Sequence, residues 1–203
     1  NLNAESKKRG VITASTGNHG QSIAYSASVF GVPAVIVSPE GANTSKVESI
    51  RNLGAELILK GKNFDDARQT VESESAKRGL QYIHAANEPL LIAGVATYTL
   101  EILEDIPDVD VIIVPIGGGS SASAACIVAK TINPKVQVIG VQSAQAPAAY
   151  HSWNSREIKS APTSTSAEGL ATSVGFELTQ CILWEYLDDF VLVDDKEIED
   201  SIV

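Results

Sequence analysis

Two short stretches rich in glycine and hydroxyl side chains hold the residues of this sequence best suited to chemistry. The first, STGNHG at residues 15–20, places an amide and an imidazole between a stretch typical of a strand and one typical of a helix. The second, GGGSS at residues 117–121, has the same setting. Backbone N–H groups at a helix start lack intrahelical partners, and the helix dipole favours negative charge there. Both stretches therefore predict loops that bind an anion.

The second loop predicts a site for one phosphate group. GGGSSA has the G-x-G-x-x-A spacing of a dinucleotide-binding loop, but the next predicted strand ends in Gln142, where a nicotinamide site needs an acidic residue. No Gly-Lys-Ser/Thr follows the glycines, which argues against a Walker loop. Small residues with the hydroxyls of Ser120 and Ser121 remain, and they suit a monophosphate. The alternative is a tight turn that needs glycine only for its backbone conformation.

The first loop differs from the second in its polar side chains. These side chains add hydrogen-bonding groups to the exposed N–H groups around Gly17, which suits a small carboxylate and one oriented polar group. The residues that supply them are Ser15, Thr16, Asn18 and His19. The alternative is that Ser15 or Thr16 only caps the helix and that His19 is a surface histidine. The residues alone leave both interpretations open.

Strands and helices alternate along the chain in an order that would position both loops. We predict strands at 11–14, 32–37, 55–59 and 80–85, and helices at 21–30, 43–54, 65–79 and 89–106. We next predict a strand before the second loop, a helix through Lys130 and a strand that ends at Gln142. We predict loop and short helix at 143–168, and a helix followed by a strand at 177–193. Ser45 and Glu48 have capping-box spacing. This alternation predicts parallel sheets with ligands at the carboxyl ends of strands.

Composition and charge exclude several classes of protein. The 203 residues include 15 Lys and Arg against 25 Asp and Glu, a net charge of −10, and the basic residues form no run. We therefore expect no nucleic-acid partner. No apolar stretch reaches the roughly 18 residues of a membrane span, and no signal segment opens the chain. We expect a cytoplasmic protein that does not bind membranes.

The cysteines and the chain ends carry two further expectations. Cys126 and Cys181 have neither disulfide-framework nor metal-ligand spacing, so we predict two buried thiols and no metal site. The sequence begins at Asn1 without an initiator Met, and its last residues, DKEIEDSIV, predict the start of a helix. We expect a fragment of a longer protein.

The two loops together resemble those of the β-family (fold type II) of pyridoxal-phosphate enzymes, in the threonine/serine dehydratase and serine racemase branch. The resemblance implies an α/β protein with the two-lobed parallel-sheet fold of the tryptophan synthase β-subunit-like enzymes. It implies a small domain at 10–88, with 1–9 and 89–203 as part of a large cofactor-binding domain. The segments in the order and spacing of that branch are KKRGVITASTGNHGQSIAYSASVFGVPAVIV, NTSKVESIRNLGAELIL, NEPLLIAGVATYTLEIL, PIGGGS, VIGVQSAQAPA and AEGLAT.

The resemblance also implies a role for each loop. The implied cofactor is pyridoxal 5'-phosphate, with Asn18 hydrogen-bonded to its ring hydroxyl. Its phosphate would be held by Gly117, Gly118, Gly119, Ser120 and Ser121. The substrate carboxylate would be surrounded by Ser15, Thr16, Gly17, Asn18 and His19.

The resemblance places the lysine that forms the Schiff base outside this chain. In this family the lysine lies upstream of the first loop in a Ser-Phe-Lys segment, and residues 1–14 contain no such segment. We therefore expect it before Asn1, which leaves this chain without a catalytic lysine.

The implied activity is that of a threonine/serine dehydratase, an ammonia-lyase that removes water from a hydroxy amino acid and yields a 2-oxo acid and ammonia. Its place would be in amino-acid metabolism such as isoleucine biosynthesis, and we expect a homo-oligomer. One alternative is an amino-acid racemase, with the hydroxyl of Thr16 as proton donor. The metal-binding acids of the racemase branch correspond here to Gln142 and Ala148, which argues against it. The other alternative is a non-catalytic fragment.

Overall fold

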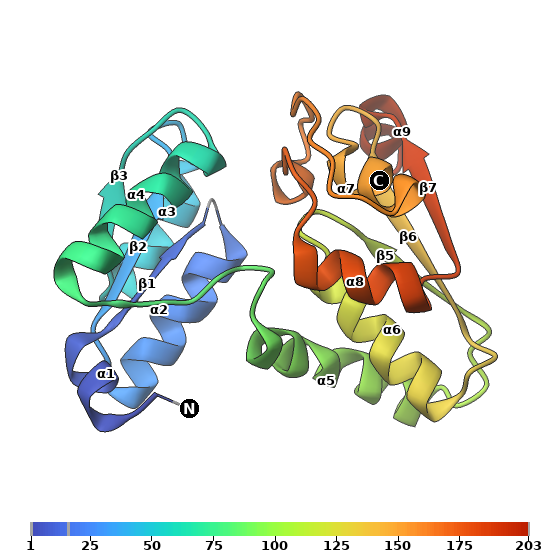
Figure 1. Cartoon of the computed structure of the whole chain (residues 1–203), viewed down its shortest axis with the longest axis horizontal. Helices are drawn as coiled ribbons and strands as arrows, with labels where there is room; N and C mark the ends of the chain where they lie inside the picture. Colours follow the sequence, from blue (N-terminus) through green and yellow to red (C-terminus); the bar gives the residue numbers. More distant parts are fainter. Residues whose placement is uncertain (1, 16, 203) are drawn as a thin grey trace. The chain divides into compact units, whose positions relative to one another are not determined.

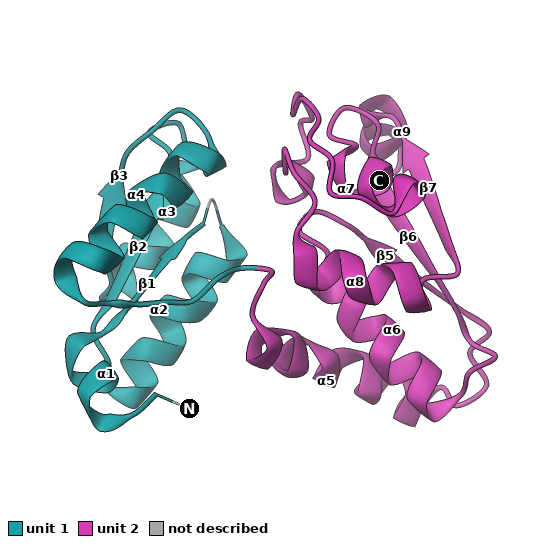
Figure 2. Cartoon of the chain, in the orientation of Figure 1, with its two compact units in different colours: residues 1–85 teal, residues 86–203 magenta. Residues whose placement is uncertain are grey.

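A computed structural model describes residues 2–15 and 17–202 (Figure 1). The chain divides into two compact units, Asn1–Ala85 and Ala86–Val203 (Figure 2). Each unit is built on a parallel sheet. The predicted α/β class with parallel sheets is therefore confirmed.

The first unit contains a four-stranded sheet in the order β3-β2-β1-β4. Every strand pair in it is parallel, as the alternation of strands and helices predicts. Its strands are β1 (Val11–Ala14), β2 (Ala34–Ser38), β3 (Glu56–Leu59) and β4 (Gln81–Tyr82). Its helices are α1 (Ala4–Arg9), α2 (Asn18–Phe30), α3 (Thr44–Asn52) and α4 (Phe64–Arg78).

Helices cover both faces of this sheet, because successive residues of a strand point to opposite sides. Ile12 of β1 packs in one cluster with Val71 of α4. Val11 packs in another cluster with Ala27 of α2, and α3 lies beside α2 on that face. The carboxyl end of β1, where the first glycine loop starts, thus lies between two helical layers.

Two predicted details of the first unit are wrong. The predicted capping box of Ser45 and Glu48 does not start α3, because the side chain of Asn43 accepts hydrogen bonds from the N–H groups of Ser45 and Lys46. Ser45 consequently lies inside the helix. The strand predicted at 80–85 shortens to the two residues of β4.

The second unit contains a three-stranded parallel sheet in the order β5-β6-β7. Its strands are β5 (Val111–Pro115), β6 (Gln137–Ser143) and β7 (Asp189–Val193). Its helices are α5 (Pro89–Asp105), α6 (Ser120–Ile132), α7 (Ala148–Ser155), the short 3-10 helix η1 (Glu168–Leu170), α8 (Glu177–Tyr186) and α9 (Asp195–Asp200). The side chain of Asp194 caps α9, which confirms the helix start predicted there.

One face of the second sheet forms the main core of its unit. Ile112 and Val114 of β5 pack there with Cys126 of α6 and Leu183 of α8. Burial raises the pKa of the Cys126 thiol to about 12, which keeps it protonated. Cys181 is exposed, so the prediction of two buried thiols is correct only for Cys126.

The unit boundary lies close to the domain boundary that the resemblance implies. The structure groups residues 1–9 with the first unit, whereas we expected them in the larger domain. The assignment of 10–88 to a small domain, and of 1–9 and 89–203 to a large one, stays a prediction. No helix within residues 2–15 and 17–202 is long and apolar enough to cross a membrane.

Candidate functional site

The first glycine loop joins β1 to α2 and is held in shape by Ser15. This residue is buried, and its hydroxyl accepts hydrogen bonds from the N–H of Gly17 at 3.1 Å and of Gly20 at 2.8 Å. Ser15 therefore caps the first turn of α2 from outside the helix, as one of the two interpretations held. Its contact with a substrate stays a prediction. Thr16 lies outside the described residues.

Backbone N–H groups open α2 at the end of this loop. The first intrahelical hydrogen bond runs from the N–H of Gln21 to the carbonyl of Gly17 at 3.2 Å. The N–H groups of Asn18 and His19 come before it and have no intrahelical partner. The Asn18 side chain is exposed. A helix start of this kind attracts a carboxylate.

His19 is a hydrogen-bonded, partly buried residue rather than a surface histidine. Its Nε2 lies 2.9 Å from Thr13 Oγ1, and the Thr13 hydroxyl donates to the carbonyl of Ile83 at 2.7 Å. Because the hydroxyl has one proton and gives it to Ile83, Nε2 of His19 donates to Thr13 Oγ1. Burial lowers the pKa of His19, so its ring is neutral at pH 7.

A second histidine, His84, lies in the same unit just after β4. Burial lowers its pKa to about 4, and the charges of Arg68 and His19 contribute in the same direction. Its ring lies 5.5 Å from that of Tyr82, whose pKa burial raises to about 12. The sequence analysis missed His84, because the residue falls in a predicted strand and has no motif of its own.

Lys46 is the cation beside the first loop. A Cβ built on Gly17 would lie 3.0 Å from Cδ and 3.3 Å from Nζ of Lys46, so the glycine leaves room for this side chain. Lys46 lies in the first turn of α3, which follows β2, and β2 pairs in parallel with β1. The sequence analysis missed its position. The available signal was that neighbouring parallel strands end at the same edge of a sheet.

The second glycine loop joins β5 to α6. Gly119 caps α6 with φ +90° and ψ 0°, a left-handed conformation that favours glycine. The first bond of this helix runs from the N–H of Ser123 to the carbonyl of Gly119 at 2.9 Å. The N–H groups of Ser120 and Ser121 therefore have no intrahelical partner. This is the arrangement predicted for a phosphate site.

The glycines before α6 are required by close packing as well as by backbone conformation. A Cβ on Gly117 would lie 2.5 Å from the carbonyl oxygen of Gly169, a backbone atom that cannot move aside easily. A Cβ on Gly118 would lie 3.3 Å from that of Ala86. Backbone conformation alone therefore does not account for these glycines, and their packing is compatible with anion binding.

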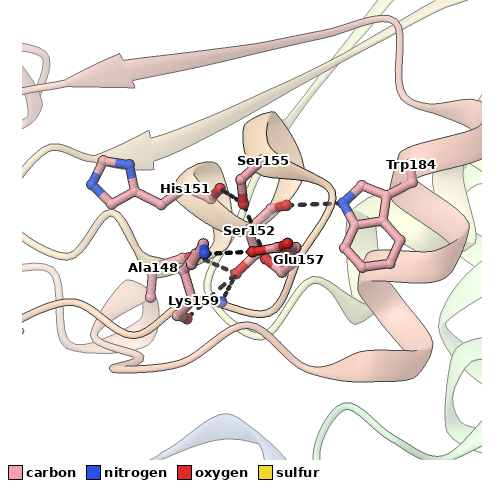
Figure 3. Close-up of polar contacts among 7 residues, drawn as sticks. All are labelled: Ala148, His151, Ser152, Ser155, Glu157, Lys159 and Trp184. Atoms are coloured by element: carbon pink, nitrogen blue, oxygen red, sulfur yellow. Dashed lines mark hydrogen bonds and ion pairs between the residues drawn. The ribbon is translucent and has the colours of Figure 1, made fainter.

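Figure 3 shows the contacts of Ser152 of α7, which anchor the start of the segment that contains Gly169, the residue against which Gly117 packs. The hydroxyl of Ser152 donates to the carbonyl of Ala148 at 2.7 Å and accepts from the N–H of Lys159 at 2.9 Å. Its carbonyl accepts from Trp184 Nε1 of α8 at 3.0 Å. A bridge between Ser160 and Val174 then closes the base of the segment that contains η1. The segment that packs against Gly117 of the second loop is thus fixed to α7 and α8.

The structure brings the predicted site residues together in two groups. The first unit holds Ser15, Gly17, Asn18 and His19 around the start of α2. The second unit holds Gly117, Gly118, Gly119, Ser120 and Ser121 around the start of α6. The roles of these residues stay predictions.

The residues that would correspond to metal-binding acids have other roles. The carbonyl oxygen of the Gln142 side chain accepts from the N–H of Tyr150 at 2.9 Å, and both Gln142 and Ala148 are fully buried. Within the described ranges, no group of three or more His, Cys, Asp and Glu side chains could hold a metal ion.

Comparison with known proteins covers the whole chain. The family described as "Pyridoxal-phosphate dependent enzyme" matches residues 1–203. L-threonine ammonia-lyase of Thermotoga maritima is 42% identical over 100% of this chain and 51% of its own length. L-threonine ammonia-lyase of Geobacter sulfurreducens is 40% identical over 98% of this chain and 50% of its own. The chain thus spans about half the length of these curated relatives.

Solved structures of the same fold agree with these matches. The processed form of threonine deaminase isoform 2 from Solanum lycopersicum superimposes with a TM-score of 0.93 at 33% identity, over 100% of this chain and 59% of that one. Maize serine racemase superimposes with the same TM-score of 0.93 at 33% identity, over 99% of this chain and 61% of that one. These structures confirm the fold that the sequence predicts.

Proposed function

The chain belongs to the family of pyridoxal-phosphate dependent enzymes, and on that premise we propose that it is part of an L-threonine/L-serine ammonia-lyase. Such an enzyme removes water from a hydroxy amino acid and yields a 2-oxo acid and ammonia. Relatives named L-threonine ammonia-lyase, 42% and 40% identical, support this activity. The observation that carries the proposal is the position of the second glycine loop. This loop follows the parallel strand β5 and leads into α6, whose first N–H groups have no partner within the helix.

The residues of the second unit fit the phosphate of this cofactor. Gly118, Ser120 and Ser121 are partly exposed. The N–H groups of Ser120 and Ser121 have no partner within α6. The hydroxyl of Thr172 donates a hydrogen bond to the carbonyl oxygen of Gly117, and that of Thr179 donates one to the carbonyl oxygen of Gly118. When bound, pyridoxal phosphate supplies a ring that stabilises negative charge at the α-carbon of an amino acid.

The residues of the first unit would bind and orient the amino acid. The N–H groups at the start of α2 and the charge of Lys46 suit its carboxylate. The exposed amide of Asn18 would hold the ring hydroxyl of the cofactor. Ser15 keeps the loop in shape through its bonds to Gly17 and Gly20. His19 holds its proton on Nε2, where Thr13 fixes it, so it would add no charge at neutral pH.

Purified intact protein with pyridoxal phosphate, given L-threonine or L-serine, tests this function. We expect equal amounts of 2-oxo acid and ammonia, with little D-serine formed from L-serine. D-serine in excess of 2-oxo acid would instead establish the racemase alternative, which the fold shared with maize serine racemase keeps in view. Neither product, together with no cofactor absorbance, would show a non-catalytic protein. The homo-oligomer, the cytoplasmic location, the part in isoleucine biosynthesis and the Schiff-base lysine before Asn1 stay predictions.

A further inference from the structure

Two threonines far along the chain contact the second glycine loop from behind. The hydroxyl of Thr179 donates to the carbonyl of Gly118 at 2.8 Å, and that of Thr172 donates to the carbonyl of Gly117 at 3.1 Å. Thr179 is fully buried in the first turn of α8, and Thr172 is partly buried just after η1. Neither belongs to the residues that the sequence analysis assigned to this loop.

These two bonds determine which way the peptide groups of the loop face. A trans peptide is planar and holds its N–H opposite to its C=O, and the described residues contain no cis peptide. The carbonyl of Gly117 shares a plane with the N–H of Gly118, and the carbonyl of Gly118 shares one with the N–H of Gly119. Each threonine that holds a carbonyl therefore turns the N–H of the same peptide group in the opposite direction, away from the threonine.

The orientation of these peptides matters for an anion. A phosphate is attracted by N–H groups and repelled by carbonyl oxygens, and a glycine peptide can rotate at little steric cost. Rotation of either peptide would put an oxygen in place of a donor. Gly119 itself lies close to Thr179, since a Cβ built on this glycine would lie 3.1 Å from Oγ1 of Thr179.

We propose that Thr179 and Thr172 are positioning residues that hold the N–H groups of Gly118 and Gly119 toward the phosphate of the cofactor. The proposal rests on the proposed function, because it takes this loop to be the phosphate site. Thr179 has the larger effect, since its bond is shorter and shielded from water. The threonines act through the glycine peptides and do not touch the cofactor.

The test measures cofactor binding by the intact protein after removal of pyridoxal phosphate. The variants are Thr179→Val, which keeps the shape and loses the hydroxyl, Thr179→Ser, which keeps the hydroxyl, and Thr172→Val. Thr70→Val is the matched control, because its hydroxyl bonds the carbonyl of Asp66 at 3.1 Å in the first unit. Each protein is titrated with pyridoxal phosphate and with pyridoxal, which lacks the phosphate, and its melting temperature is recorded.

We expect Thr179→Val to weaken binding of pyridoxal phosphate about ten-fold, the size of one lost hydrogen bond, and to leave binding of pyridoxal unchanged. Thr172→Val should show a smaller loss of the same kind, Thr179→Ser should recover binding, and Thr70→Val should match the unaltered protein. Equal losses for both ligands, or none for either, would overturn the proposal. Should Thr179→Val fail to fold, Thr172→Val decides by the same comparison. Unaltered protein that binds pyridoxal phosphate no better than pyridoxal would refute the phosphate site itself, and with it the proposed function.

Discussion

The polar residues in and beside the first loop have different surroundings. Both Ser15 and His19 form hydrogen bonds within the first unit. Ser15 accepts from N–H groups at the start of α2, and His19 bonds the hydroxyl of Thr13. The Asn18 side chain is exposed, and Lys46 lies over Gly17. Mutations of Asn18 and Lys46 therefore test the proposed binding of the cofactor and the substrate.

We expect Asn18→Ala and Thr16→Ala to differ in the intact enzyme. Asn18 would set the tilt of the cofactor ring, and loss of one fixed polar contact of this kind costs on the order of 10²-fold in rate. Thr16→Ala should spare most elimination, because its hydroxyl would serve only reprotonation. The measurement is release of 2-oxo acid and exchange of the α-proton with L-threonine and L-serine. Comparable losses of elimination in both variants would place Thr16 in the carboxylate site.

Lys46→Met should raise KM for L-threonine and change kcat little. The methionine keeps the stem that packs on Gly17 and removes the charge that would attract the carboxylate. We expect a rise of about five- to ten-fold, which corresponds to one exposed charge-assisted contact. Lys60→Met, at the end of β3 in the same unit, is the control. A fall in kcat with unchanged KM would argue against this role.

His84 should make the protein less stable in mild acid. Its pKa is about 4 in the folded chain and 6.5 ordinarily, so between these values the unfolded chain binds a proton that the folded chain does not. The free energy of unfolding therefore falls as the pH drops from about 6.5 toward 4. Above that range His84 is neutral in both states and does not lower the free energy of unfolding. Urea unfolding between pH 7 and 5 measures this slope. His84→Gln should flatten it, and an unchanged slope would contradict the assignment.

Among the elements, the two strand-to-helix loops are held in different ways, the second by contacts with a distant segment and the first by its own residue Ser15. Gly117 packs on the backbone of Gly169, which belongs to a segment anchored to α7 and α8 through Ser152. The first loop is held by Ser15 from within. Glycine at 117 is therefore a packing requirement, whereas Gly94 in α5 has open space where a Cβ would lie.

This difference predicts opposite results for two glycine substitutions. Gly94→Ala lies in α5, where a Cβ would meet no atom within 4 Å, and it should stabilise the protein by about 0.5–1 kcal/mol. Gly117→Ala should destabilise it by about 1–3 kcal/mol, since a Cβ would lie 2.5 Å from a backbone oxygen. Denaturant unfolding of both variants measures these changes. Stabilisation by Gly117→Ala would show that the loop is loosely packed.

The molecule as a whole has two units with separate cores, one on each sheet. Each core is formed by residues of a single unit, and each sheet is parallel. The spectroscopic reporters are unevenly divided, because both tryptophans, Trp153 and Trp184, belong to the second unit.

Unfolding by urea should therefore give different curves for different probes. Tryptophan fluorescence reports the second unit alone, whereas far-ultraviolet circular dichroism reports the helices of both. We expect the two curves not to coincide, since separate cores unfold separately. Labelling of the buried Cys126 should follow the fluorescence, and exposed Cys181 should react at once. Coincident curves for all probes would show one cooperative unit.

The sequence by itself determined the α/β class, the order of the elements and the positions of the two strand-to-helix glycine loops. These features depend on local rules: apolar periodicity, glycine at the end of a strand, and unpaired N–H groups at a helix start. The resemblance then added the family, which the comparisons confirm. The sequence did not determine every helix start, since Asn43 rather than Ser45 caps α3.

Only the tertiary structure decided which residues support those loops. Thr179 touches Gly118, and Lys46 lies against Gly17, because parallel strands and their helices bring distant segments to one edge of a sheet. The same holds for His19, whose neutral state follows from burial beside Thr13 and Ile83. Burial and individual contacts between distant residues depend on packing in three dimensions, whereas the order of the strands indicates only which segments share an edge of the sheet.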